Sequence, residues 1–168
     1  MANIYLLEDD KRFIAQAEDS FQEAHAHTLY PLEAQLSNKA EYWRNLDIMP
    51  HDLVVLDLNL QLAGARWTGL EVLQLLDNEK KAGRLPGLER VLIATGVPGQ
   101  VDPENIYPEI GFVSRFKVYG MEKGEDSAGR TSAVGYGASL VRKVEAIIAG
   151  TEEELNNKPL DDHFDDVE

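Results

Sequence analysis

Several apolar stretches of this chain end on polar side chains that could do chemistry. "DLVVLDLNL", residues 52–60, runs through strand-forming residues to the carboxylate of Asp57. "IYLL", residues 4–7, leads directly into two acidic residues. The chain has no cysteine, so a metal site or a reaction must use oxygen and nitrogen atoms. The candidate residues at these ends are Glu8, Asp9, Asp57, Asn59, Thr95 and Lys117.

The elements that position these residues can be read from periodicity. Apolar runs of strand length alternate with segments of helical period, which is typical of an α/β fold. "LVVLD", residues 53–57, is so continuously apolar that we expect a central strand with both faces covered. Strands are expected at 4–7, 27–32, 53–57, 90–95 and 111–116. Helices are expected at about 11–24, 68–81 and 138–149, with a short helix that contains Tyr42, Trp43 and Leu46 and another that starts near Pro103 and ends before residue 111.

Five strands that alternate with helices can be wound in few ways, because crossover connections are short and right-handed. The common solution is a flavodoxin-like three-layer sandwich with a parallel sheet in the order 2-1-3-4-5. In such sheets ligands bind beyond the carboxyl ends of the strands. We therefore expect the candidate residues to meet at one edge of the sheet.

Composition limits the function. The chain of 168 residues fits one domain and contains no run of the roughly 18 apolar residues that a membrane span requires. A net charge of −14 disfavours nucleic acid and anionic membranes and favours a protein partner. We expect a domain at residues 1–150 and a disordered acidic tail at residues 151–168. The start "MANIYLLEDD" is unlike a secretion signal, so we expect a cytoplasmic protein.

The order and spacing of these stretches resemble the receiver domain of bacterial two-component response regulators, of the chemotaxis-regulator type. The resemblance covers roughly residues 3–150. It rests on "LLEDD", "HDLVVLDLNL", "TGLEVLQLL", "VLIATG" and "FVSRFK". It implies that Asp57 accepts a phosphoryl group. It further implies a Mg²⁺ site made by the carboxylates of Glu8, Asp9 and Asp57 and the main-chain carbonyl of Asn59.

The chemistry of phosphoryl transfer explains why these residue types belong together. A carboxylate is a modest nucleophile, so its attack on phosphorus depends on positioning and on neutralised charge. Clustered carboxylates repel one another, and Mg²⁺ prefers such oxygen ligands. By the resemblance, Thr95 contacts the phosphoryl group through its hydroxyl, and Lys117 is the invariant cation that pairs with a phosphoryl oxygen.

Two stretches depart from the pattern of the family. "LNLQLAGARWT", residues 58–68, is about four residues longer than the usual loop and lacks its proline, so we expect Arg66 and Trp67 to overhang and shape the site. Val118 stands in place of the usual proline after the lysine, and Ser114 in place of an aromatic residue.

The second departure is a glycine-rich stretch at residues 118–137, which the pattern predicts to be a long loop. Within it, Tyr119, Met121 and Tyr136 are expected to act as apolar anchors that select a protein partner. A tolerated surface insertion is the competing interpretation.

The favoured hypothesis is a stand-alone receiver that takes its phosphoryl group from a histidine kinase or phosphotransfer protein. It would signal to a downstream protein by contact, as a monomer or weak homodimer, and would not be an enzyme apart from hydrolysis of its own acyl phosphate. One alternative is a receiver-like interaction module that works without phosphorylation. Another is a Mg²⁺-dependent phosphohydrolase with an aspartyl nucleophile, suggested by the D-x-N spacing of Asp57 and Asn59.

Overall fold

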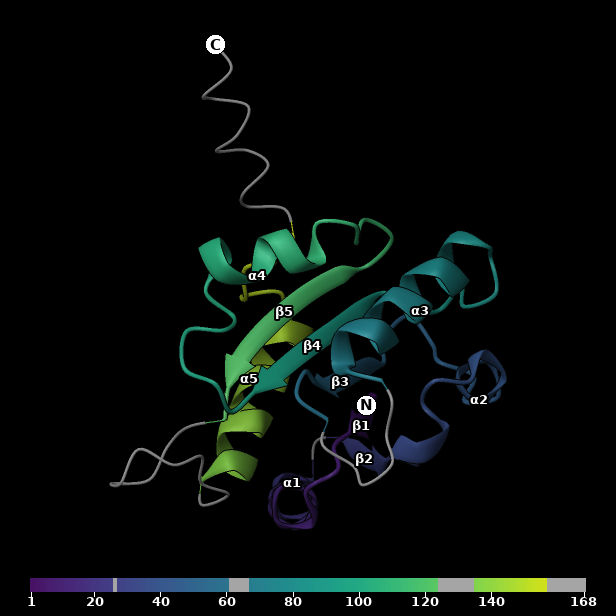
Figure 1. The fold of residues 1–168 in the computed structure, drawn as a ribbon. Helices are drawn as coiled ribbons and strands as arrows, with labels where there is room; N and C mark the ends of the chain where they lie inside the picture. Colours follow the sequence, from purple (N-terminus) through teal and green to yellow (C-terminus); the bar gives the residue numbers. More distant parts are fainter. Residues whose placement is uncertain (26, 61–66, 124–134, 157–168) are drawn as a thin grey trace.

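The computed structural model describes residues 1–25, 27–60, 67–123 and 135–156. Its centre is a five-stranded parallel sheet in the order β2-β1-β3-β4-β5, and five α-helices connect and cover it (Figure 1). The predicted flavodoxin-like α/β fold is therefore confirmed. The strands are β1 (Asn3–Leu7), β2 (Thr28–Pro31), β3 (Leu53–Asp57), β4 (Arg90–Thr95) and β5 (Lys117–Glu122).

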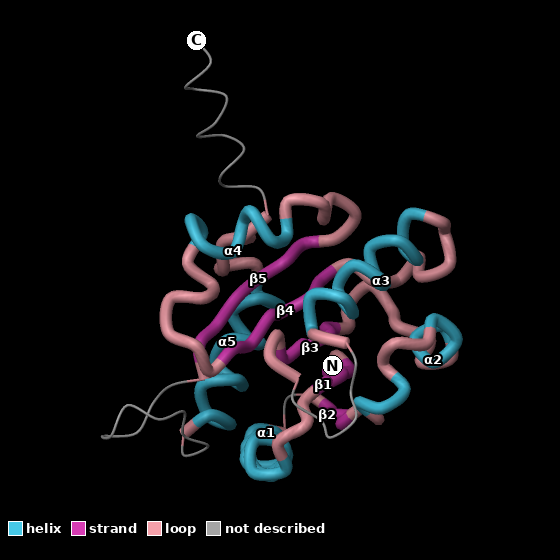
Figure 2. The backbone as a smooth tube through the Cα atoms, in the orientation of Figure 1, coloured by secondary structure: helices cyan, strands magenta, loops and turns pink. Residues whose placement is uncertain are grey.

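The helices lie in two layers, one on each face of the sheet (Figure 2). On one face α1 (Lys11–Ala24) and α5 (Tyr136–Ala149) bury Phe13 and Leu140, among others, against the sheet. On the other face lie α2 (Ala40–Arg44), α3 (Gly69–Lys81) and α4 (Pro103–Ile110), with a short 3-10 turn at Ala34–Leu36 before α2. These layers leave the two ends of the strands as the places where polar chemistry can occur.

The central strand β3 shows why the order of the sheet is stable. Leu53 and Val55 point into the layer of α1 and α5, while Val54 and Leu56 point into the opposite layer. All five residues of β3 are buried, as expected for a strand covered on both faces. Burial of such side chains contributes about 1.5–3 kcal/mol each. Asp57 ends this buried strand and is therefore held on a rigid element.

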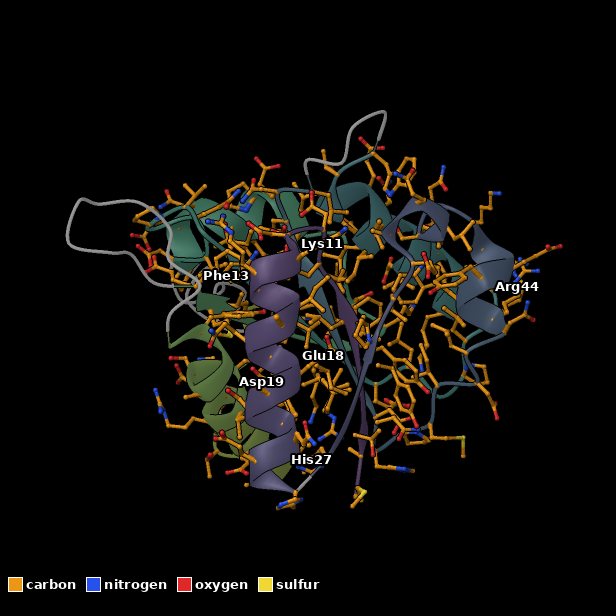
Figure 3. The ribbon with its side chains drawn as sticks, turned by 90° about the horizontal axis from the view of Figure 1, so that it is seen from below. Lys11, Phe13, Glu18, Asp19, His27 and Arg44 are labelled. Atoms are coloured by element: carbon orange, nitrogen blue, oxygen red, sulfur yellow. The ribbon has the colours of Figure 1, made fainter. Side chains whose placement is uncertain are left out.

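The starts of α1 and α3 follow the capping chemistry of the sequence, whereas no side chain among the described residues caps α2, α4 or α5. The side chain of Asp10 accepts a hydrogen bond from the backbone N–H of Arg12 at 2.9 Å and so caps α1. Thr68 caps α3 by accepting from the N–H of Glu71 at 3.3 Å. Helix α1 runs along one face of the sheet, with Phe13 near its first turn and Glu18 and Asp19 further along (Figure 3). The first turn of α1 thus lies beside the carboxyl end of β1.

The prediction for the fifth strand is wrong. Residues 111–116 do not form a strand, and β5 is instead Lys117–Glu122. Val113 and Phe116 are apolar because they pack into the core from the connection that precedes β5. Consequently Lys117 begins the strand that it was expected to end.

A second correction follows for the stretch 118–137. Its first five residues belong to β5, and Tyr136 and Gly137 belong to α5. Residues 124–134 lie outside the described residues, as does part of the expected tail, residues 157–168. The expected long loop is therefore shorter at both ends than the glycine pattern indicates.

Candidate metal and phosphoryl site

The site lies where β1, β3 and β4 end next to one another. Leu7 pairs with Leu56, and Asp57 pairs with Ala94, so the residues that follow or end these strands are neighbours. Asp57 is 5% exposed, and its Oδ1 accepts a hydrogen bond from the backbone N–H of Asn59 at 3.0 Å. This bond fixes the orientation of the carboxylate at the edge of the sheet.

The three acidic residues predicted for the site form one cluster. Glu8, Asp9 and Asp57 each offer a carboxylate oxygen, and these oxygens lie within 4.8 Å of one another. The Oε2 atom of Glu8 accepts hydrogen bonds from the backbone N–H groups of Asp9 at 3.0 Å and Asp10 at 3.2 Å. The backbone of the turn after β1 therefore holds the Glu8 carboxylate in place.

The cation of the cluster is Lys123, which sequence reasoning missed. Its Nζ contacts Glu8 Oε1 directly and lies 3.5 Å from Asp57 Oδ2. Its side chain is 5% exposed and lies over the ring of Phe13, with 4.5 Å between Nζ and the ring centroid. Its backbone N–H donates to the carbonyl of Thr95 at 2.7 Å, which extends the β4–β5 ladder by one residue. Lys123 thus enters the site from the carboxyl end of β5.

Lys117, the predicted cation, does not join the cluster. It opens β5 at the opposite end of the strand, where it pairs in register with Arg90. Its side chain is 60% exposed, and its Nζ lies 3.7 Å from Glu154 Oε1. The assignment fails because the strand boundary was misplaced by six residues. Lys123 lies six positions later in the sequence, directly after "KVYGME".

The electrostatics of the cluster favour a further cation. The pKa of Glu8 is raised to about 8, chiefly by burial and then by the negative charge of Asp57, while Lys123 acts in the opposite direction. When fully ionised, the three carboxylates and Lys123 carry a net charge of −2. One divalent ion would balance this charge and relieve the repulsion that raises the pKa.

The donor set fits a hard divalent ion such as Mg²⁺. Carboxylate oxygens at a rigid strand edge are the ligands that such an ion binds. Glu8, Asp9, Asp57 and Asn59 line one open cleft together with Lys123. Glu8, Asp9 and Asp57 can each offer a carboxylate oxygen to such an ion, and both oxygens of Glu8 also accept hydrogen bonds.

Asn59 is hydrogen-bonded to both Asp57 and Thr95 and so links the two residues. The side-chain amide of Asn59 donates to Thr95 Oγ1 at 2.8 Å and to Gln100 Oε1 at 2.9 Å. Thr95 is fully buried at the end of β4, and its hydroxyl also donates to Gln100 Oε1. The predicted residues Asn59 and Thr95 are therefore brought together, and Gln100 joins them as a residue that the sequence did not single out.

The overhang expected from residues 66 and 67 takes a different form. Arg66 lies outside the described residues. The indole N–H of Trp67 donates to Ser37 Oγ at 2.7 Å, and the ring packs against the core layer of α2 and α3. Trp67 thus ties its loop to the segment before α2 and does not cover the acidic cluster.

The apolar anchors expected at residues 119, 121 and 136 are also corrected. Tyr119, Met121 and Tyr136 are all buried in the layer of α1 and α5. Burial raises the pKa of the Tyr136 hydroxyl, and the charges of Glu8 and Asp57 raise it further. Tyr136 lies beside the site, with its ring packed edge-to-face against Phe13, and none of the three residues offers an exposed surface to a partner.

Comparison with protein-family models, with characterised proteins and with solved structures finds no match for this chain. None of the helices in the described residues combines the length and apolar character that a bilayer-spanning segment needs. The chemistry of the site must therefore be judged from its own geometry.

Proposed function

We propose that this protein is a receiver-type signalling domain that accepts a phosphoryl group on Asp57. The observation that carries the proposal is the position of the Asp57 carboxylate. It ends a buried central strand, shares a cluster with Glu8 and Asp9, and lies 3.5 Å from the amine of Lys123. A nucleophilic carboxylate, a place for a divalent cation and a fixed amine are what phosphoryl transfer to an aspartate requires.

In the proposed reaction, a carboxylate oxygen of Asp57 attacks the phosphorus atom of a donor. The new P–O bond makes an acyl phosphate, and the bond from phosphorus to the leaving group breaks, with the electron pair and any proton going to that group. Lys123 stays protonated and pairs with a phosphoryl oxygen, so it compensates charge without transferring a proton. Thr95 can donate its hydroxyl hydrogen to a second phosphoryl oxygen.

Mg²⁺ is the cation that the cluster suits best. Asp9 and Asp57, the main-chain carbonyl of Asn59 and Glu8 would hold it. When bound, it would neutralise charge on the phosphoryl oxygens and lower the barrier to attack. The residues of this chain supply the rest: the rigid end of β3 holds the nucleophile, and the backbone N–H of Asn59 fixes one of its oxygens.

The donor and the output follow from the same proposal. A phosphohistidine in a histidine kinase or phosphotransfer protein is the matching donor. Its phosphoryl group transfers readily to a carboxylate, as the P–N bond breaks and the electron pair stays on the imidazole nitrogen. The net charge of −14 favours output by contact with a protein and disfavours nucleic acid and anionic membranes. A cytoplasmic protein that is a monomer or weak homodimer fits these partners.

The test is incubation with Mg²⁺ and acetyl phosphate, followed by intact mass measurement. One added phosphoryl group is expected in the wild-type protein and none in Asp57→Asn. Asp10→Asn is the matched control, because Asp10 neighbours the cluster but serves as the cap of α1, and it should be modified like the wild type. No adduct with any phosphodonor would favour the alternative of an interaction module that works without phosphorylation.

A further inference from the structure

The hydroxyl of Thr95 already uses all of its hydrogen-bonding capacity. A threonine hydroxyl has one hydrogen to donate and two lone pairs that accept. Its hydrogen goes to Gln100 Oε1, while its oxygen accepts from Asn59 Nδ2 at 2.8 Å and from the backbone N–H of Val97 at 3.1 Å. Because the side chain is fully buried, these bonds are made without competition from water.

This saturation conflicts with a contact to a phosphoryl group on Asp57. Phosphoryl oxygens only accept hydrogen bonds, so Thr95 can approach them only by donating its one hydrogen. That hydrogen is held by Gln100. The bond from Thr95 to Gln100 must therefore break before the hydroxyl can serve the phosphorylated site.

Gln100 is well held for such a role. Its Oε1 atom accepts from both Thr95 and Asn59, and its Nε2 atom lies 3.5 Å from Asn59 Oδ1. Its backbone N–H donates to the carbonyl of Val97 at 3.2 Å within the turn after β4. The side chain is thus fixed by the loop that carries it and by two residues of the site.

We propose that Gln100 is a positioning residue that keeps the Thr95 hydroxyl turned toward the loop after β4 and so opposes its engagement with a phosphoryl group on Asp57. The proposal rests on the function proposed above and concerns its regulation. Gln100 would set how strongly the resting protein favours the unmodified state of Asp57.

The first test is the binding of beryllium trifluoride, a phosphoryl mimic, in the presence of Mg²⁺, measured by titration calorimetry. Gln100→Leu removes the acceptor for the Thr95 hydroxyl at similar size. We expect about fivefold tighter binding, which corresponds to one neutral hydrogen bond that no longer has to be broken. Gln100→Glu keeps the acceptor oxygen and adds a negative charge near the anionic mimic, so it should not show the gain in affinity expected of Gln100→Leu.

Two further variants isolate the cause. In a Thr95→Val background, Gln100→Leu should change the affinity by less than about twofold, because there is no hydroxyl to release. Asn105→Leu removes the bond from Asn105 Nδ2 to the carbonyl of Gly99 at 2.8 Å, in the same loop, without touching Thr95. It should leave the affinity unchanged. An equal gain in Asn105→Leu, or in the Thr95→Val background, would overturn the proposal in favour of general loosening of the loop.

The second test needs no ligand. A hydroxyl proton that is buried and held by an acceptor exchanges slowly with water, so its NMR signal should be observable for Thr95 in the wild type and should broaden or disappear in Gln100→Leu. An unchanged Thr95 hydroxyl signal in Gln100→Leu overturns the proposal about Gln100. Absence of beryllium trifluoride binding in all variants, with the loss of that signal in Gln100→Leu, instead overturns the proposed function and leaves the restraint on Thr95 established.

Discussion

Lys117 and Lys123 stand at the two ends of the same strand and have opposite environments. Lys117 is 60% exposed and pairs loosely with Glu154, whereas Lys123 is 5% exposed and contacts Glu8 and Asp57. The amine of Lys117 adds little, because exposed ion pairs contribute about 0–1 kcal/mol. The amine of Lys123 is fixed among carboxylates in a site largely shielded from water. A lysine at the carboxyl end of β5 thus contacts the acidic cluster, whereas a lysine at the start of the strand lies away from it.

The contacts at the start of β5 stabilise the edge of the sheet. Asn156, 6% exposed, accepts from the N–H of Val118 at 3.2 Å and donates to the carbonyl of Phe116 at 2.9 Å. The N–H of Leu155 donates to the carbonyl of Val118 at 2.7 Å. The segment after α5 thereby satisfies the N–H and the carbonyl of Val118 on the free edge of the sheet, which would otherwise be open to pairing with another strand. Stability should therefore depend on one end of β5 and reactivity on the other.

The largest effect is expected from removing the acidic pair. Glu8→Ala with Asp9→Ala should abolish detectable Mg²⁺ binding and phosphorylation, because only Asp57 of the cluster would remain. Titration calorimetry with Mg²⁺ and intact mass after acetyl phosphate treatment measure the two losses. Circular dichroism is the control for folding, since relief of charge repulsion should leave the metal-free fold intact. Unchanged Mg²⁺ affinity in the double variant would contradict the assigned site.

The two lysines give the sharpest contrast. Lys123→Met should lower the rate of phosphorylation by about 100-fold, the usual effect of losing a fixed group that stabilises charge in the transition state. Lys117→Met should change the rate by less than about twofold, because its amine lies at the far end of β5. Single-exponential rates from intact mass at fixed acetyl phosphate concentration measure both. Equal effects in the two variants would remove the distinction between the two ends of the strand.

Asn156→Ala should lower the stability of the fold and leave the acidic cluster at the other end of β5 in place. Its loss leaves buried backbone groups of Phe116 and Val118 without their partners, at about 1–3 kcal/mol for each unsatisfied group. We expect a total loss of about 2–6 kcal/mol in the free energy of unfolding, measured by urea denaturation. The exposed Asn105→Ala is the matched control and should cost less than about 1 kcal/mol. Comparable losses in both variants would mean that the segment after α5 contributes little to the sheet edge.

The smallest effect is expected at Trp67. Trp67→Phe keeps most of the packed ring but removes the hydrogen bond to Ser37 Oγ, so the free energy of unfolding should fall by about 1 kcal/mol. Phosphorylation should remain within about twofold of the wild type, because Trp67 packs toward α2 and α3. A large loss of phosphorylation with unchanged stability would instead show that this residue shapes the site.

The sequence was most informative where a strand is continuously apolar. β1, β3 and β4 are buried on both faces, so their apolar runs mark both the strands and their carboxyl ends. That pattern was sufficient to predict the sheet order and the positions of Glu8, Asp9, Asp57 and Thr95.

The edge strand β5 could not be read in this way. Gly120 interrupts the apolar pattern of this strand. A glycine is needed there because a Cβ would lie 2.7 Å from Leu155 Cδ1 and 3.0 Å from Val101 Cβ, two residues that are distant in the sequence. The apolar run before it belongs to a core-packed connection whose carbonyls are satisfied by Asn156. Both causes are tertiary contacts across about 20–43 residues, so local propensity gave the wrong strand and the wrong lysine.

The most direct test of the central claim is to locate the modified residue. The wild-type protein would be treated with Mg²⁺ and acetyl phosphate, reduced with borohydride, digested and sequenced by tandem mass spectrometry. Borohydride converts an aspartyl phosphate to homoserine and leaves a free carboxylate unchanged. We expect homoserine at position 57 in treated wild-type protein and none at that position in Lys123→Met treated for the same short time. Homoserine at another aspartate, or none at any position in the wild type, would contradict the assignment of Asp57 and Lys123 as the reacting pair.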